Sequence, residues 1–398
     1  MHQQIIDNIY EVLGTIGEAV EYLACNEDKQ VFADVQYGRE SIENLLETES
    51  GISVRKQIEA DNLSDEDWLQ EMYRVMDDIV HPLRVKNYYD QEFLKLISYL
   101  WNTDTKTMVR NMIDKLQAYR TISEQGYTDI VEYFSKYSFW GTLSPEEEDY
   151  TTFEWRAATL KRRSYEFLWL YKRMEDYLSK RTLYAILMNW ALLDSYQLDE
   201  IKSPFIDYYE PDIFPGNKED VFVDVGAYTG DSIHNYVKMY GNAYSKIYAY
   251  EISESTCEIL RKTTKDFHDV VIRQKGAGKE TGVMSLAENT DASANKVEKT
   301  GVLSDEKIEI VTLDEELIDE GITFIKMDIE GAEQDALLGC RQIIQTNHPK
   351  LAICTYHGYD ALWEIPSMID VMNPNYKFYM RHYGGNLIPT EFVLLCKD

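Results

Sequence analysis

The sequence predicts an α/β protein in two parts, an all-α N-terminal half followed by a mostly parallel sheet with helices on both faces. Before residue 200 the apolar positions recur at helical spacing. After residue 220, short apolar runs alternate with amphipathic segments, and the last two runs flank Gly384-Gly385-Asn386, which predicts a closing antiparallel hairpin. We therefore expect a helical domain at 1–200 and a second domain at 201–398, joined by a Pro- and Tyr-rich connector.

The N-terminal half offers packing residues rather than chemistry. Its first helix has apolar residues at a spacing close to that of a coiled-coil seam: Ile5, Ile9, Val12, Ile16 and Leu23. This helix could pair with a second copy to form a homodimer, or it could be an ordinary amphipathic helix. Further along, Ser144-Pro145-Glu146-Glu147 has the residues of a helix start.

In the C-terminal half the alternation predicts individual elements. The expected strands are 221–226, 246–251, 270–275, 322–329, 350–356, 376–383 and 391–397, and the expected helices are 230–240, 254–265, 332–346 and 360–371. A polar insertion at 278–321 contains one further candidate strand, 308–313.

Charge and cysteine usage narrow the choice of partner and location. The 398 residues carry a formal charge of −30, which disfavours nucleic acid and anionic membrane surfaces. The five cysteines are scattered singly, without metal-ligand spacing, which is typical of a reducing compartment. No signal-like segment opens the chain and no apolar run approaches a membrane span, so we expect a cytoplasmic protein.

The run VFVDVGAYTGD at 221–231 predicts a buried strand, a tight glycine turn and a helix N-terminus. About 20 residues further on, a second strand ends in Glu251, where a carboxylate can bind a ribose diol. A dinucleotide fingerprint has glycine where this turn has Asp224, and a carboxylate repels a diphosphate but attracts the cationic end of S-adenosylmethionine (SAM). We therefore expect SAM as cofactor, bound by these residues: Asp224, Gly226, Ala227, Tyr228, Gly230, Asp231, Glu251 and Ile252. From the connector, Tyr208 and Tyr209 could fold over the cofactor or simply pack on the surface.

Charged residues inside a second apolar run point to catalysis. In ITFIKMDIEGAE, at 322–333, strand alternation places Lys326, Asp328 and Glu330 on one face, at the edge of the sheet that also carries the glycine turn. Asp328 and Glu330 could face a substrate, or Lys326 could form an ion pair with either of them. His357, at the end of the next strand, could act as a base or merely hydrogen-bond to Asp360.

A metal site is an open alternative at the same place. Asp328, Glu330 and Glu333 are hard oxygen ligands of the kind that Mg²⁺ prefers. Nothing in their spacing demands a metal, so we assign no metal ligand from the sequence.

Several strings together resemble the FkbM family of SAM-dependent methyltransferases, from roughly Tyr208 to the C-terminus. They are FVDVGAYTGDS (222–232), YAYE (248–251), TLDE (312–315), FIKMDIEGAE (324–333), PKLAICTYH (349–357), LWEIP (362–366) and RHY (381–383). The resemblance implies a class I methyltransferase, Rossmann-like fold and methylation of a hydroxyl, typically on a sugar or secondary metabolite. By motif, Asp224, Gly226 and Gly230 would line the SAM site, Glu251 would bind the ribose, and Asp328 and Glu330 would face the reaction centre. Many relatives have asparagine or phenylalanine in place of Tyr228, and the resemblance does not extend to the helical half, which inherits no function from it.

Three functions remain in view. The first is a SAM-dependent O-methyltransferase with a small-molecule or glycan acceptor and with Asp328 or His357 as the base. The second is a nicotinamide-dependent oxidoreductase on a similar sheet. The third is a non-catalytic SAM-binding adaptor that acts through its helical half.

Overall fold

The structure is a computed structural model that describes residues 83–287 and 303–398. The expected coiled-coil seam at Ile5–Leu23, and the homodimer that depends on it, lie outside the described residues. Within the described part of the chain, no helix has both the length and the apolar character needed to cross a membrane.

From residue 83 to residue 220 the structure has helices and no strand, as predicted. The α-helices are α5 (Tyr88–Asn102), α6 (Thr105–Ile122), α7 (Glu124–Lys136), α8 (Thr151–Arg162), α9 (Ser164–Arg173), α10 (Tyr177–Leu192) and α11 (Tyr196–Ile201). Two short 3₁₀ helices, η1 (Ser138–Trp140) and η2 (Pro145–Glu147), lie between α7 and α8.

The helix start predicted at Ser144 is wrong. Only the single turn η2 forms there, and the Ser144 side chain makes no capping hydrogen bond. Glu148 has a φ of 56°, in the left-handed region, which ends the turn, and a bridge joins Ser144 to Asp149. The following α-helix therefore begins only at Thr151.

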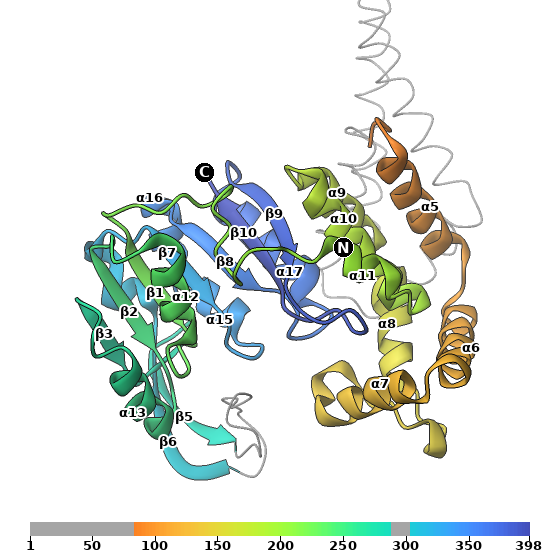
Figure 1. Cartoon of the computed structure of the whole chain (residues 1–398), viewed down its shortest axis with the longest axis horizontal. Coiled ribbons are helices and arrows are strands. Elements are labelled where there is room, and N and C mark those ends of the chain that lie inside the picture. Colours follow the sequence, from red (N-terminus) through yellow and green to blue (C-terminus); the bar gives the residue numbers. More distant parts are fainter. Residues whose placement is uncertain (1–82, 288–302) are drawn as a thin grey trace, which may run out of the picture. The chain divides into compact units, whose positions relative to one another are not determined.

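The C-terminal half is built on a seven-stranded sheet with the order β3-β2-β1-β7-β8-β10-β9 (Figure 1). Strands β3, β2, β1, β7 and β8 are mutually parallel, and β10 pairs antiparallel with both β8 and β9. The predicted parallel sheet with an antiparallel hairpin is therefore confirmed. The bounds are β1 (Val221–Val225), β2 (Lys246–Tyr250), β3 (Val270–Arg273), β7 (Phe324–Met327), β8 (Lys350–Cys354), β9 (Lys377–His382) and β10 (Phe392–Lys397).

The polar insertion forms a second, three-stranded sheet with the order β4-β6-β5. These strands are β4 (Gly276–Ala277), β5 (Gly282–Ala287) and β6 (Leu303–Val311). The candidate strand at 308–313 is thus the end of a longer strand that pairs antiparallel with β5.

Six α-helices connect these strands: α12 (Asp231–Tyr240), α13 (Glu254–Thr263), α14 (Leu313–Leu317), α15 (Glu333–Leu338), α16 (Arg341–Asn347) and α17 (Ala361–Met372). The single helix expected at 332–346 is divided into α15 and α16 at Gly339. A Cβ at this position would lie 2.0 Å from the carbonyl oxygen of Gly278, so the backbone of the insertion passes where a side chain would otherwise stand.

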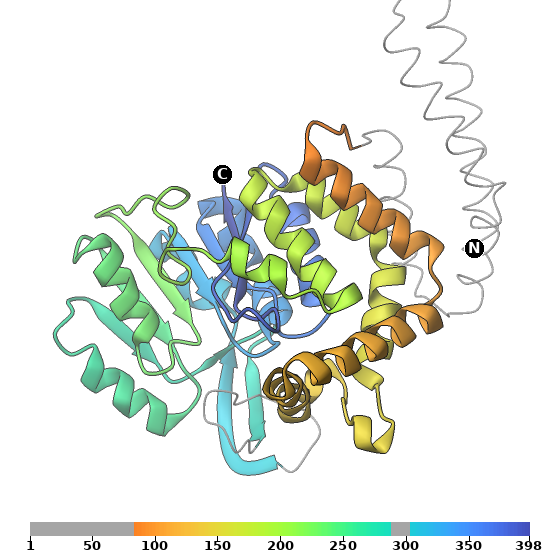
Figure 2. The same cartoon turned by 45° about the vertical axis from the view of Figure 1, so that its right-hand side comes forward.

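The chain divides into two compact units, residues 1–91 with 165–172 and residues 92–164 with 173–398. The second unit contains both the sheet and most of the described helices (Figure 2). Within it, Arg381 on β9 donates to Asp176 at 2.7 Å, and the hydroxyl of Tyr359 accepts a hydrogen bond from Arg156 on α8 at 3.1 Å. The expected domain boundary near residue 200 differs from this division and stays a prediction.

The turn after β1 depends on a close approach of two backbone segments. Gly226 has a φ of +80°, and a Cβ there would lie 2.0 Å from the carbonyl oxygen of Asp328. Gly321 also lies in the left-handed region, with a φ of +66°, but has no atom within 4 Å of such a Cβ. We predict that Gly226→Ala lowers the free energy of unfolding by about 3 kcal/mol or more, because it adds a clash to the strain of positive φ.

The control variant Gly321→Ala introduces only the strain of the left-handed region and should lose about 1–2 kcal/mol. Urea unfolding of both variants measures the difference. Equal losses would contradict the close approach of the two segments.

Candidate active site

A cavity of about 670 Å³ opens at the carboxyl ends of β1, β2 and β7. This is the edge of a parallel sheet at which ligands bind in such folds, and the volume is typical of small-molecule sites. The insertion and the α7–η1 segment complete its lining.

On one side of the cavity, Glu251 follows β2 and is fixed by backbone donors. Tyr228 N–H donates to its Oε2 at 3.1 Å, and Ser253 N–H donates to its Oε1 at 2.9 Å. Burial raises the pKa of Glu251, against these hydrogen bonds. The carboxylate therefore has a set orientation where β2 meets the cavity, and its role as a ribose-binding acid stays a prediction.

Not every predicted cofactor residue lies in the cavity lining. The residues that do are Gly226, Tyr228, Asp231, Glu251 and Ile252. Ala227 and Gly230 do not line it. Gly230 has a φ of +90° and starts α12, and a Cβ there would press on Leu260 and Thr263 at 3.0 Å.

Asp224 corrects the electrostatic expectation drawn from the sequence. It is fully buried, does not line the cavity, and its Oδ1 lies 3.1 Å from Lys326 Nζ, while its Oδ2 accepts a hydrogen bond from Ser232. Burial raises the pKa of Asp224, and Lys326 opposes this rise. Its charge is thus balanced from within the sheet, and Lys326 pairs with Asp224 rather than with Asp328 or Glu330, the partners considered as an alternative from the sequence.

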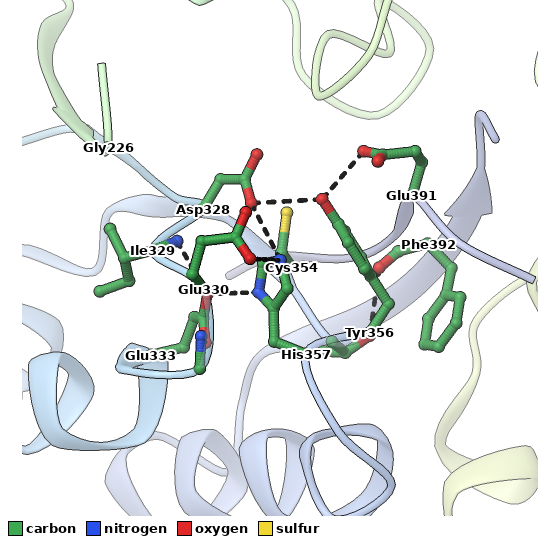
Figure 3. Close-up of polar contacts among 12 residues, drawn as sticks. Gly226, Asp328, Ile329, Glu330, Glu333, Cys354, Tyr356, His357, Glu391 and Phe392 are labelled. Atoms are coloured by element: carbon green, nitrogen blue, oxygen red, sulfur yellow. Dashed lines mark hydrogen bonds and ion pairs between the residues drawn. The ribbon is translucent and has the colours of Figure 1, made fainter. Parts of the chain in front are cut away.

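At the opposite side, the end of β7 and the end of β8 bring together the predicted catalytic residues (Figure 3). His357 Nδ1 lies 2.8 Å from Glu333 Oε1, and Nε2 lies 3.5 Å from Asp328 Oδ1 and 3.7 Å from Glu330 Oε2. Its partner is therefore Glu333 rather than Asp360. Burial lowers the pKa of His357, but Glu333, Asp328 and Glu330 outweigh it and raise the pKa to about 9. An imidazole that is already protonated at neutral pH does not favour the role of base.

Glu333 holds the loop that carries these residues. It is fully buried, and its carboxylate accepts from Ile329 N–H at 2.8 Å and Gly331 N–H at 3.0 Å. Both its oxygens are used within the protein, so Glu333 orients His357 and the loop rather than facing the cavity.

Two tyrosines that donate to Asp328, Tyr208 and Tyr356, complete the cluster together with Glu391. Tyr208 donates to Asp328 Oδ2 at 2.7 Å, so this connector tyrosine reaches the site. Tyr209 instead packs in the core and donates to Ser232 O at 2.8 Å. Tyr356 Oη lies 3.0 Å from Glu391 Oε2 and 3.3 Å from Asp328 Oδ1.

Tyr356 and Glu391 are absent from the sequence predictions. Burial and the nearby Asp328 raise the pKa of Glu391 to about 7. One signal could have found it: Glu391 precedes an antiparallel strand, whose start lies at the edge where the parallel strands end.

Backbone strain is concentrated around the same cavity. Four of its lining residues other than glycine have positive φ: Tyr208 (70°), Tyr228 (45°), Glu330 (57°) and Glu391 (51°). Such conformations cost about 1–3 kcal/mol each and cluster at functional sites. The strained backbone around the cavity therefore lowers the stability of the fold.

The helical segment contributes an aromatic wall to the cavity, formed by Tyr133, Tyr137 and Phe139. The Tyr133 and Tyr137 rings lie 4.8 Å apart, and Phe139 meets His357 edge-on at 6.3 Å. The sequence shows no chemistry in this half of the chain, yet these three aromatic residues line the cavity and Phe139 contacts His357.

Comparisons with known proteins agree with this geometry. Residues 224–384 match the family described as "Methyltransferase FkbM domain". The chain is similar to the solved structure of methyltransferase FkbM from Methylobacillus flagellatus, at 24% identity and a TM-score of 0.52, over 62% of this chain and 64% of that one, slightly under two thirds of its length. A further similar structure is an rRNA methylase from Streptococcus thermophilus, at 14% identity and a TM-score of 0.30, over 46% and 88% of the two chains. No curated protein matches.

The Asp224–Lys326 pair yields a stability prediction. Removing one partner of a buried pair leaves the other charge uncompensated, so Asp224→Asn and Lys326→Met should each lower the free energy of unfolding by about 3 kcal/mol. The double variant should lose clearly less than the sum of the two. Urea unfolding of all three variants gives the coupling.

The exposed pair Lys246–Glu320, with N and O 3.0 Å apart, is the matched control. Lys246→Met and Glu320→Gln should show a coupling within experimental error, because solvent screens this pair. Additive losses for Asp224 and Lys326 would disprove the pairing.

Proposed function

Because residues 224–384 are an FkbM methyltransferase domain, a family that implies SAM-dependent methyl transfer, we propose that this protein is an O-methyltransferase that acts on a hydroxyl of a sugar, glycan or secondary metabolite. One observation carries the proposal: a single cavity contains Glu251 on one side and Asp328 on the other. The first suits the ribose of a donor, and the second suits an acceptor hydroxyl.

The cavity fits SAM in its donor set and its charge. Glu251 offers two oriented oxygens to a ribose diol, beside the turn that begins at Gly226. Carboxylates surround the cavity, among them Asp231, Asp328 and Glu330, and this charge favours a sulfonium and disfavours the diphosphate of a nicotinamide dinucleotide. The lysines of the insertion are paired, Lys275 with Glu309 and Glu316, and Lys279 with Asp335.

The residues of this chain would bind, orient and deprotonate the acceptor. When bound, SAM supplies an electrophilic methyl group. Asp328 would accept the hydroxyl proton of the acceptor as the acceptor oxygen takes the methyl group. Burial raises the pKa of Asp328, but Lys326 and His357 outweigh it, so the group is a carboxylate able to accept that proton. Tyr208, by donating to Oδ2, holds it in place.

The aromatic wall supports a ring-shaped acceptor. Tyr137 and Phe139 offer flat apolar faces opposite a carboxylate cluster, which suits a molecule with one apolar face and several hydroxyls. This arrangement also favours an enzyme over an adaptor, because it assigns the helical segment a place in the site.

The expected location and partners remain part of the proposal. Cys257, Cys340, Cys354 and Cys396 are free and buried, which supports a reducing, cytoplasmic setting. The charge of −30 supports an acceptor other than nucleic acid. A homodimer through the N-terminal helices stays a prediction.

We predict that Glu251→Ala weakens SAM binding on the order of a hundredfold, because charge-assisted hydrogen bonds to the ribose are lost. Glu251→Gln keeps one acceptor oxygen and should lose less. Calorimetry with SAM and with NAD measures both, and Glu258→Ala, an exposed acid on α13, is the control. Unchanged SAM affinity, or tighter binding of NAD than of SAM, would refute the proposed donor site.

We predict that Asp328→Asn keeps SAM affinity within about twofold and lowers turnover by about 10²–10⁴-fold, because the acceptor loses its base. Methyl transfer from labelled SAM to a panel of saccharides, nucleotide sugars and hydroxylated metabolites provides the assay, with exposed Asp266→Asn as the control. Full turnover by Asp328→Asn would remove Asp328 from the mechanism. Tight SAM binding without transfer to any acceptor would favour the adaptor.

A further inference from the structure

One buried nitrogen in the catalytic cluster has no hydrogen-bond partner. His357 is 8% exposed, and its Nδ1 is committed to Glu333. Among the described residues, nothing hydrogen-bonds to Nε2, which faces the carboxylates of Asp328 and Glu330 (Figure 3). Leaving such a buried polar atom unsatisfied costs about 1–3 kcal/mol, so it needs an explanation.

The distances from Nε2 to the two carboxylates suit three side chains that bind one metal ion. The distances of 3.5 Å to Asp328 and 3.7 Å to Glu330 are too long for a good direct hydrogen bond. Asp328, Glu330 and His357 each offer one ligand atom, and these three atoms lie within 4.8 Å of one another. Two atoms bound to a common cation at about 2.0–2.2 Å lie roughly 3–4.4 Å apart. Both distances from Nε2 fall within that range.

Glu333 supplies the second shell that such a site needs. A metal-bound histidine usually donates its other ring N–H to a carboxylate, which fixes the tautomer and turns the other ring nitrogen toward the ion. The Glu333–Nδ1 hydrogen bond of 2.8 Å is of this kind, and it leaves Nε2 as the atom that faces the acids. A bound ion would take the place of the proton on Nε2, because a metal ligand must be deprotonated.

The local charge also calls for a cation. Asp328, Glu330 and Glu333 place three carboxylates around one imidazole. The nearby Lys326 lowers the pKa of Asp328 but forms its own ion pair with Asp224. A divalent ion would balance this excess of negative charge.

We propose that Asp328 Oδ1, Glu330 and His357 Nε2 bind one divalent transition-metal ion of the Mn²⁺ type, with Glu333 as its orienting second-shell residue. A mixed set of two carboxylates and one imidazole suits such an ion better than Mg²⁺, which prefers oxygen alone. The role of the ion rests on the proposed function: it would bind the acceptor hydroxyl and ease its deprotonation, while Asp328 Oδ2 receives the proton beside Tyr208.

Mn²⁺ alone is the probe, and electron paramagnetic resonance of the free ion is the measurement, at physiological ionic strength on the full chain stripped of metal. We expect one Mn²⁺ to bind per chain, and Glu330→Gln and His357→Gln each to weaken binding at least tenfold. Since a chain of charge −30 attracts cations everywhere, Glu258→Gln, which removes an exposed carboxylate, is the matched control and should bind Mn²⁺ as the wild type does. Circular dichroism and thermal unfolding of each variant identify any loss of fold.

SAM calorimetry on the same preparations separates this inference from the proposed function. If SAM binds and Glu330→Gln retains Mn²⁺ as well as Glu258→Gln does, the metal site is overturned and the methyltransferase proposal stands. If Mn²⁺ binding depends on Glu330 and His357 but SAM does not bind, the metal site stands and the proposed function falls. Should His357→Gln unfold, the folded Glu330→Gln variant decides the test.

Discussion

The buried pair of Lys326 and Asp224 is the interaction on which the active-site edge depends. The two residues stand opposite each other on the adjacent central strands β7 and β1. Lys326 Nζ also donates to the carbonyl oxygen of Gly226 at 2.8 Å, so one ammonium ties the strand pair to the turn that follows β1. Because the pair is shielded from solvent, each charge is stabilised mainly by the other. The loops that follow β1 and β7 therefore start from two strands whose buried charges are neutralised.

The cavity is lined by two carboxylates that are held in different ways. Glu251 is held by backbone N–H groups, which set its direction without adding a cation. Asp328 is held by Tyr208 and lies near Lys326 and His357, which keep it charged. The same chemical group therefore has two different environments in one cavity, one set by backbone hydrogen bonds and the other by nearby cations. Positive φ angles at Tyr228 and Glu330 show that both arrangements are imposed by the surrounding fold.

Part of the helical segment lines the active-site cavity. Helices α6–α8, α10 and α11 lie in the compact unit that contains the sheet, and the aromatic wall reaches the acidic cluster from the end of α7. Arg156, buried and hydrogen-bonded to Tyr359, is one link between the two parts. The helical segment therefore contributes residues to the cavity as well as to the core.

Much of this molecule was determined by local sequence. Alternating apolar runs predicted the strands, the hairpin and their order of appearance, because periodicity reports which face of an element is buried. The strings around Gly226, Glu251 and Asp328 located the catalytic edge, because the ends of parallel strands converge there. Only the tertiary structure decided what each charge meets. Asp224 faces Lys326, and His357 faces Glu333. Glu391 and the aromatic wall join the site from distant segments. None of these contacts follows from spacing along the chain, because burial and long-range pairing depend on three-dimensional packing.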